Sequence, residues 1–412
     1  MRRMTVLLLV LPACLAEEKP AREEGPTYWA DVRPILDRSC ARCHHDGGFA
    51  TSFDDAATAQ AFAAAMATRT AAGEMPPPAP DPECAPYEGS DVLFLGDDDK
   101  ATIAAWAEAG APLGDEADAP AEGWKATELD VDLALYGAAP YQPVFDETGN
   151  DYRCFVLDPE QDGKVYVTGF QPLVDNARIV HHVVVWLVDV TEDFDEGADG
   201  RPGFDCPGFG EGDWEFFSGW APGGHPVTLP PGMGLALAAR HKLVLQMHYY
   251  EAFEGAEAET DQSGYGLVTT DSVDTEVYQM PLGVYDFTVP ADTSDHTETM
   301  IVPWQDSWGD VVVIGSSPHM HVLGSGFDFK VHKADGTEQC VVEMDDWNFH
   351  NQVTVMLDEP VRIAGGDTVE VTCHWDNSAG NPAQTSDPPQ DVYWGEGTNE
   401  EMCFAFTLGY ED

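Results

Sequence analysis

The sequence predicts a mainly β protein in which two tandem antiparallel β-sandwich domains, jelly-roll-like in form, follow a small α-helical domain. The 412 residues are too many for one ordinary domain, and a hydrophobic content of 43% supplies enough material for several cores. Residues 98–111 have the acidic start, Ala-rich body and final glycine of a helix. From about residue 126 onward, short alternating apolar runs are separated by Gly, Pro, Asp and Asn, which is typical of sandwiches and barrels.

The charge of the chain excludes one class of partner. The sequence has 74 acidic and 19 basic residues, which give a formal net charge of −55. Such a surface repels nucleic acid and anionic membranes, so we expect no nucleic-acid partner.

The first 16 residues are expected to be an export signal and not part of the fold. Arg2 and Arg3 precede the apolar run 6–11, which is too short to span a membrane as a stable helix. Cys14 follows small residues in a pattern that resembles a bacterial lipobox, which implies a lipid anchor at Cys14. Pro12 is not favoured in that pattern, so plain cleavage nearby is the alternative. We therefore expect export to the periplasm, to the outer membrane as a lipoprotein, or to the medium, where disulfides persist.

Residues 26–114 are expected to form the helical domain, and they contain the motif Cys40-Ala41-Arg42-Cys43-His44. In a CxxCH motif the two thiols add to the vinyl groups of haem, and the adjoining histidine reaches the iron. A CxxC pair alone also occurs in redox and zinc sites. The adjoining histidine and the export signal favour covalent attachment of one haem c through Cys40, Cys43 and His44.

A c-type haem needs a second axial ligand, and Met75 is the candidate. It lies in the Pro-rich stretch 73–78, where a thioether can be held rigidly, and this pattern resembles the methionine loop of class I cytochromes c. Met66 lies in an Ala-rich helical run and is expected in the core, and His45 is a weaker rival ligand. The helix at 98–111 is similar to the closing helix of small cytochromes c. The resemblance implies a cytochrome c-like fold for the helical domain, with Trp106 packed near the haem.

Residues 115–125 are acidic and rich in small residues, and they are expected to be a linker. Almost 290 residues of β pattern remain, which is too much for one sandwich. We expect a first sandwich at 126–276 and a second at 277–412.

The predicted first sandwich contains two apolar strands with histidines. His181 and His182 are adjacent in the run 179–186, and His248 lies near the end of the run 243–250. Because neighbours on a regular strand point to opposite faces, both members of the pair can bind one metal only at a bulge or a strand end. The alternative is that one is a hydrogen-bonded core histidine.

The predicted second sandwich contains His319 and His321 after the apolar run 311–314. Residues two apart on a strand share a face, and paired imidazoles suit copper, zinc, iron or nickel. The alternative is a pair of hydrogen-bonded histidines at a sheet edge. Met402 is the further candidate, because a thioether beside a histidine pair selects copper, especially Cu(I), over zinc. A methionine in an arbitrary position is usually core.

The ordered motifs VHH, QMHY, HMHVLG and EEMC resemble those of the copper type II, ascorbate-dependent monooxygenases, the family of peptidylglycine α-hydroxylating monooxygenase and dopamine β-monooxygenase. The resemblance covers roughly residues 126–412. Smaller landmarks stand in the same order: Asp151-Tyr152-Arg153-Cys154, the run 229–234, and Val371-Thr372-Cys373.

The resemblance implies two copper ions, each with a set of ligands. The first, an electron-transfer copper, would be held by His181, His182 and His248. The second, which binds and activates O₂, would be held by His319, His321 and Met402.

The same resemblance implies roles for other residues. Gln246 matches a glutamine next to the bound substrate. Cys373 and Cys403 match a disulfide of the family, whereas the bridge Cys154–Cys206 matches the family's pattern only in part. Cys84 and Cys340 have no assigned partner.

The chain departs from the peptide hydroxylases of the family at the positions that grip a substrate carboxylate. Those enzymes have an arginine, an asparagine and a tyrosine where this chain has Ser317, Phe404 and Phe406. A carboxylate would find no cation here, so we expect a small neutral, hydrophobic or aromatic substrate.

The expected reaction is hydroxylation of a C–H bond by O₂ with two electrons. The reductant would be ascorbate or an electron-donor protein, and the fused haem is the candidate donor because the tether raises its local concentration. The alternative is a cytochrome-fused copper-binding or electron-transfer protein without oxygenase activity. A zinc hydrolase site at His181, His182 and His248 is the third reading, and Met402 argues against zinc at the second site.

Overall fold

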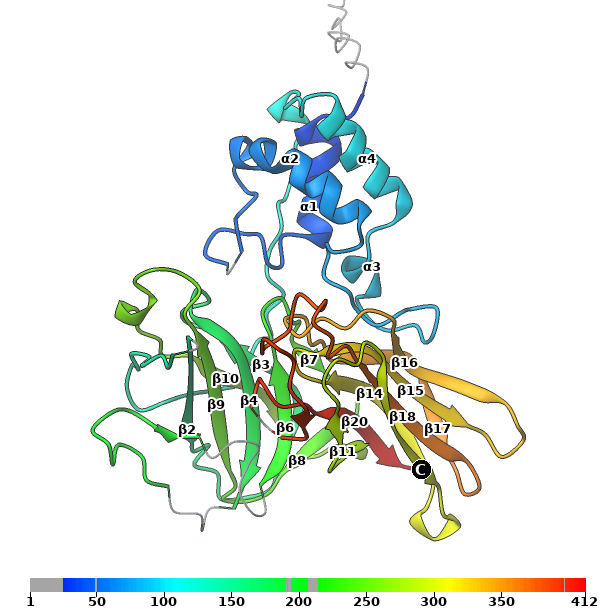
Figure 1. Cartoon of the computed structure of the whole chain (residues 1–412). Coiled ribbons are helices and arrows are strands. Elements are labelled where there is room, and N and C mark those ends of the chain that lie inside the picture. Colours follow the sequence, from blue (N-terminus) through cyan, green and yellow to red (C-terminus); the bar gives the residue numbers. More distant parts are fainter. Residues whose placement is uncertain are drawn as a thin grey trace, which may run out of the picture.

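The computed structural model describes residues 25–48, 50–147, 149–189, 191, 194–206, 214–395 and 397–412. The predicted export signal and the predicted lipid anchor at Cys14 lie outside the described residues. A helical part stands on a larger β part, in which the sheets lie side by side (Figure 1). Among the described residues, none of the helices has both the length and the apolar character needed to cross a membrane. The prediction of a mainly β chain is confirmed.

The helical part consists of short helices around an apolar core. Its helices are α1 (Arg33–Ser39), α2 (Ala56–Ala71), α3 (Ser90–Leu93) and α4 (Asp97–Glu108), preceded by a π-helical turn at Tyr28–Val32. The Asp55 carboxylate caps α2 by accepting the Thr58 N–H, and three aspartates at the N-terminus of α4 favour that end of the helix dipole. Trp106 is fully buried and donates its indole N–H to the Pro112 carbonyl, so the predicted helix closes the core of this part.

The β part is built on one nine-stranded sheet. Its strands, in spatial order, are β1 (Leu133–Tyr136), β10 (Gly264–Thr270), β3 (Val165–Leu173), β8 (Met233–Leu237), β11 (Thr275–Val284), β20 (Cys403–Glu411), β14 (Val311–His319) and β17 (Val355–Ile363), and β7 (Val227–Thr228) pairs with β3. The β8–β11 pairing is parallel, whereas the other pairs are antiparallel. This single parallel pairing joins strands from the two predicted sandwiches into one continuous sheet.

Three smaller sheets complete the β part. A five-stranded sheet has the order β5 (Phe204–Asp205), β2 (Asn150–Leu157), β9 (Lys242–Tyr250), β4 (Val180–Val188) and β6 (Glu215–Trp220). A four-stranded sheet has the order β13 (His296–Pro303), β18 (Thr368–Trp375), β15 (Gly324–His332) and β16 (Glu338–Met344). The strands β12 (Thr288–Val289) and β19 (Val392–Tyr393) form a small pair.

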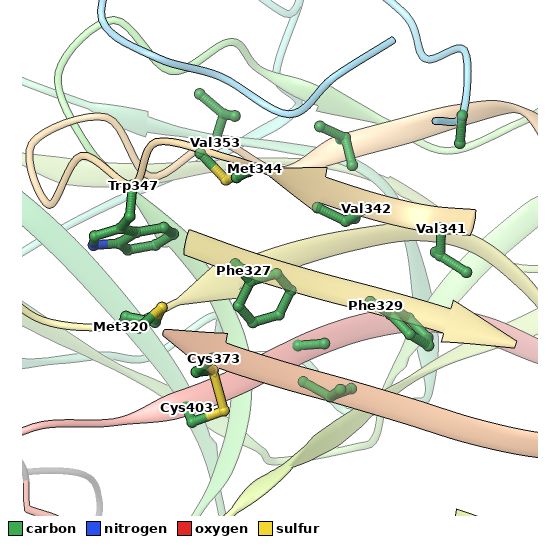
Figure 2. Packing of buried hydrophobic residues seen from close by; sticks show 14 of the residues in the cluster. Met320, Phe327, Phe329, Val341, Val342, Met344, Trp347, Val353, Cys373 and Cys403 are labelled. Atoms are coloured by element: carbon green, nitrogen blue, oxygen red, sulfur yellow. A yellow bond between two sulfur atoms is a disulfide. The ribbon is translucent and has the colours of Figure 1, made fainter. Parts of the chain in front are cut away.

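The five-stranded sheet and the four-stranded sheet each pack on the nine-stranded sheet through a separate core. One core includes Phe155 and Leu245 of the five-stranded sheet, and the other includes Phe327 and Val371 of the four-stranded sheet. Figure 2 shows the second core beside the Cys373–Cys403 disulfide.

The helical part is fixed to the second core by the segment that follows its methionine loop. Ala79, Ala85, Tyr87 and Leu93 are buried members of that core. Cys84 forms a disulfide with Cys340 on β16, although 256 residues separate the two in the chain. The two cysteines without an assigned partner therefore bond to each other, and they attach the helical part directly to the four-stranded sheet.

We predict that cleavage of the chain within residues 115–125 leaves the helical part attached. The Cys84–Cys340 bond should hold the two fragments together in non-reducing electrophoresis, and a reductant should release them. The Cys84→Ser/Cys340→Ser variant should lower the free energy of unfolding by about 2–4 kcal/mol, as loss of a long-range disulfide usually does. Separation of the cleaved wild-type chain without reductant would contradict this attachment.

Candidate metal centres

Three histidines from two neighbouring strands converge on one point. His181 and His182 lie on β4, and His248 lies on β9. The Nδ1 atom of His181 is 3.2 Å from that of His182 and 3.2 Å from that of His248, and the third side of the triangle measures 3.1 Å. The structure therefore brings together all three residues that the sequence singled out for the first centre.

A local shift in strand register makes this convergence possible. Val180 pairs with Tyr249 and His182 pairs with His248, so the register between β4 and β9 shifts at His181. The extra residue lets two adjacent side chains turn to the same side, which a regular strand forbids. This is the bulge that the sequence required if both histidines were to serve one site.

The three imidazoles are neutral, and their Nδ1 atoms face one another. Burial lowers the pKa of His181 to about 4 and places the pKa values of His182 and His248 well below 6.5. A neutral imidazole carries a single N–H. His248 hydrogen-bonds to the Asn150 Oδ1 through Nε2 at 2.7 Å, so its proton lies there and its Nδ1 is a bare acceptor.

Such an arrangement fits one metal ion. A cation among the three Nδ1 atoms, which lie 3.1–3.2 Å apart, would be within reach of all three rings. The spacing suits a metal with N–metal bonds of about 2.0–2.1 Å. The Asn150 contact is of the kind that fixes the tautomer and orientation of a ligating histidine.

A second group of ligand atoms lies at the end of β14. His319 and His321 alternate with Met320, which is fully buried in the core beside Trp347 and the Cys373–Cys403 disulfide (Figure 2). The two imidazoles therefore point away from that core, and their ring centroids are 5.2 Å apart with perpendicular planes. The same-face geometry predicted for the HxH pair is present.

Hydrogen bonds orient both rings of this pair. The Nδ1 atom of His319 contacts the Gln352 Oε1 at 2.6 Å, and the Nδ1 atom of His321 contacts the Glu400 carbonyl at 2.9 Å. Both acceptors are oxygens, so each Nδ1 is the N–H donor and each Nε2 keeps its lone pair. Burial lowers the pKa of His319 to about 3 and that of His321 to about 4, which keeps both rings neutral.

Met402 lines the same cavity as this pair, and it follows a buried carboxylate. The neighbouring Glu401 is fully buried, and its carboxylate accepts the backbone N–H of His321 at 2.9 Å and that of Leu323 at 2.7 Å. It also accepts the indole N–H of Trp375 at 2.9 Å. Glu401, the residue before Met402, is thus hydrogen-bonded to the backbone at His321 and Leu323. Burial raises the pKa of Glu401 to about 7.

Both groups open into one cavity of about 450 Å³. His182 lines it, and so do His319, His321 and Met402. Gln246, for which the resemblance implies a place beside the substrate, lines it as well. None of the described residues that line this cavity is a lysine or an arginine.

The aromatic residues predicted to contact substrate divide into two roles. Phe406 lines the cavity and stacks on Phe216, with ring centroids 4.0 Å apart. Phe404 does not line it, because its ring packs behind Phe406 and against Tyr285. Ser317 lines the cavity and hydrogen-bonds to Thr354.

Sequence reasoning missed the loop Asn348–Gln352, which touches both groups. His350 contacts His181, with its Nδ1 atom 2.9 Å from the Nε2 atom of His181. Phe349 lies between the groups, with its ring centroid 5.8 Å from that of His181 and 6.1 Å from that of His321. No spacing rule marks these residues, because they lie in a loop between β16 and β17. The only signal in the sequence was a phenylalanine next to a histidine, flanked by residues with amide side chains.

The CxxCH motif lines a separate, largely apolar cavity of about 240 Å³ in the helical part. Cys40 and Cys43 form no disulfide, and both line this cavity with His44 and Met75. The His44 Nδ1–H donates to the Thr51 carbonyl at 2.7 Å, which leaves Nε2 as the acceptor nitrogen. All four predicted haem ligands and attachment points are therefore together.

Met66 and His45, the other two candidates for the axial ligand of the haem, lie in different surroundings. Met66 also lines this cavity, but it is a buried part of the helical core. His45 does not line it, because its ring stacks on Trp124 and its Nδ1 contacts the Ala41 carbonyl.

Comparison with known proteins gives two matches to family models. The model described as copper type II ascorbate-dependent monooxygenase, N-terminal domain, matches residues 141–255. The model described as the C-terminal domain of the same family matches residues 288–412. The first matched range contains His181, His182 and His248, and the second contains His319, His321 and Met402.

The relatives that match this chain have low sequence identity to it. DBH-like monooxygenase protein 1 of Gallus gallus is 26% identical over 284 residues, which cover 61% of this chain and 43% of the relative. DBH-like monooxygenase protein 2 of Mus musculus is 25% identical over 289 residues, with coverage of 65% and 44%. The chain thus matches less than half the length of these relatives. A solved structure of infectious bursal disease virus, Gt strain, aligns at 10% identity over 70% of this chain and 75% of that chain, with a TM-score of only 0.21.

We predict that acid destabilises the metal-free protein through its buried histidines. His319 and His321 have an ordinary pKa of 6.5 when unfolded and values of about 3 and 4 when folded, so between these limits the unfolded chain binds protons that the folded chain does not. Stability should therefore fall as the pH drops from 6.5 toward 4, by about 1.4 kcal/mol per pH unit for each such histidine.

The measurement is chemical unfolding of the metal-free chain across this pH range. The many carboxylates also titrate there, so the control is the His319→Asn/His321→Asn variant, which shares them. Its pH profile should be flatter, and equal slopes for variant and wild type would contradict the prediction.

Proposed function

Because the chain belongs to the copper type II ascorbate-dependent monooxygenase family, we propose that it hydroxylates a C–H bond of a small, neutral or aromatic substrate with O₂. One observation carries the proposal: His182 of the three-histidine group lines the same cavity as His319, His321 and Met402. The family consists of copper-dependent monooxygenases.

The donor atoms of this chain fit copper at both places. His181, His182 and His248 would hold one ion through Nδ1 atoms, and His319, His321 and Met402 would hold the other through two Nε2 atoms and a thioether. Imidazole suits copper, and a thioether favours Cu(I) over zinc. Copper bound there supplies one-electron transfer at the first centre and O₂ activation at the second.

The chain's own residues prepare the site before any metal binds. Asn150 and Gln352 hold His248 and His319 in the tautomers that free the ligating nitrogens. Glu401 holds the turn that carries His321. Such second contacts typically change metal affinity by about 10–100-fold when removed.

The cavity wall supports a substrate without a carboxylate. Phe406 and Phe216 form a stacked apolar wall, and Gln246 offers an amide for orienting a polar group. Glu400 is the acidic residue among the described lining residues, and no cation accompanies it. A substrate carboxylate would lose its water there and bring a second negative charge near Glu400. An arene or an amine would bring no second negative charge into the cavity.

The proposal includes two sandwich domains at 126–276 and 277–412 and a cytochrome c-like domain at 26–114 with one covalently attached haem c. Cys40 and Cys43 would bind the vinyl groups, and His44 and Met75 would be the axial ligands. The apolar cavity that these four residues line supports the fit, as does the free Nε2 of His44. The haem would act as the electron donor, with ascorbate as the alternative reductant.

Export of the chain is part of the proposal. Three disulfides, Cys84–Cys340, Cys154–Cys206 and Cys373–Cys403, suit an oxidising compartment. We assign the protein to the periplasm, to the outer membrane through Cys14, or to the medium.

We predict two copper ions and one haem iron per chain in metal analysis. His248→Ala should bind one copper fewer because two imidazoles cannot replace three, and Met402→Ile should lose most Cu(I) affinity at the other centre. His332→Ala is the control, since this histidine pairs with Glu338 and Glu370 away from both groups. Zinc in place of copper would favour a hydrolase. Copper without substrate-dependent O₂ uptake would leave a carrier.

We predict substrate-dependent O₂ uptake with aromatic amines, phenols or small amides, and a product heavier by one oxygen atom. Matched pairs that differ only in a carboxylate should differ at least about tenfold in kcat/KM, in favour of the neutral member. Ser317→Arg should reduce or reverse this preference by supplying a cation for the carboxylate. A wild-type preference for carboxylates would refute the assigned substrate class.

A further inference from the structure

We propose that the loop Asn348–Gln352 is the electron route from the haem pocket of the helical part to the three-histidine centre, with Asn351 and His350 as its two contacts. The inference rests on the proposed function, in which the fused haem is the donor. It assigns a task to five consecutive residues that lie outside both sets of predicted metal ligands.

Asn351 is the contact with the haem pocket. Its side chain is 3% exposed, and its Nδ2 donates to the Pro78 carbonyl at 2.7 Å and the Pro77 carbonyl at 3.3 Å. Its Oδ1 accepts from the Arg42 guanidinium at 3.3 Å. Pro77 follows Met75 in the methionine loop, and Arg42 lies between the two cysteines of the CxxCH motif. One amide side chain therefore touches both halves of the pocket.

His350 is the contact with the three-histidine centre. Its Nδ1 is 2.9 Å from the Nε2 of His181, whose other nitrogen faces His182 and His248. With copper bound at Nδ1, the proton of His181 would lie on Nε2 and be donated to His350. The route from pocket to centre thus consists of hydrogen bonds joined by the backbone between two adjacent residues.

A competing branch leaves the same loop through Gln352, which contacts His319 at 2.6 Å. The two branches differ in chemistry. The His350 side chain interposes one saturated carbon, its Cβ, before the contact with His181, whereas the Gln352 side chain interposes two saturated carbons before the contact with His319. Saturated links couple electronic states weakly, so the His350 branch is the better conductor and leads to the three-histidine centre.

The loop is rigid and the pocket is held against it. Asn348 accepts the His350 N–H through its side chain and the Asn351 N–H through its carbonyl, both at 2.9 Å. On the opposite side of the motif, Arg42 donates to the Gly223 carbonyl at 3.1 Å. Gly223 has φ +84, and a Cβ there would lie 2.7 Å from the Cys43 sulfur, so only glycine allows this approach. The Cys84–Cys340 bond completes the attachment.

Each transfer moves one electron. Ferrous haem iron becomes ferric, and a cupric ion at the three-histidine centre becomes cuprous. No bond forms or breaks in the protein, and the proton shared by His181 and His350 stays on His181.

The test follows haem absorbance in the anaerobic, copper-loaded, full-length protein after a light-triggered flavin reductant delivers less than one electron per molecule to the haem. Wild-type haem should reoxidise as the cupric spin signal falls. His350→Ala should slow this reoxidation at least about tenfold because the contiguous contact is lost. His350→Asn should retain most of the rate, since an asparagine oxygen can replace Nδ1 as acceptor. His332→Ala should retain it all.

The variants also separate this inference from the proposed function. His350 is exposed, so its alanine variant should keep its fold, its copper content and its cupric spectrum, and excess ascorbate should restore hydroxylation. Asn351→Leu, which removes the other contact, should slow reoxidation as well. A wild-type haem that never reoxidises would refute the haem as donor. Wild-type rates in both copper-loaded variants would overturn the route and leave the donor role standing.

Discussion

The convergence of three imidazole Nδ1 atoms, 3.1–3.2 Å apart, is the constraint on which the rest of this structure depends. The rings come from two strands, and burial removes the water around each of them. The fold must therefore hold these side chains from outside. It does so with a register shift in β4 and a hydrogen bond between His248 and Asn150.

The second group obeys the same constraint by different means. Burial lowers the pKa of His319 and of His321, so both rings are neutral. Each ring donates its Nδ1–H to a protein oxygen, which leaves Nε2 as the acceptor nitrogen. The buried Glu401 carboxylate joins the histidine turn to the chain before Met402, and the Cys373–Cys403 bond fixes the chain after it. Since β20 and β11 belong to the sheet that β8 continues, strands from both predicted sandwiches lie in one framework. The five-stranded sheet that carries the three-histidine group packs on this framework, to which β14 and His319 belong.

The helical part is also held in place by several contacts. A flexible linker alone would raise the local concentration of a donor without orienting it. Here a disulfide, a buried segment of the second core and a glycine contact at Cys43 place the CxxCH pocket against a loop that reaches both histidine groups. The proposed donor is therefore oriented as well as tethered.

Local chemistry in the sequence was enough to select histidines and cysteines that the structure brings together. The alternation His319-Met320-His321 predicts two rings on one face, CxxCH predicts its own pocket, and the adjacency of His181 and His182 predicts a bulge, because each depends on backbone geometry over a few residues. The same reasoning could not pair Cys84 with Cys340, which are 256 residues apart, or bring His350 to His181, which are 169 apart. It also expected Phe404 to contact substrate, whereas its ring lies behind Phe406. Contacts of that kind depend on how the sheets pack, and only the tertiary structure decides which loop of one sheet meets which strand of another.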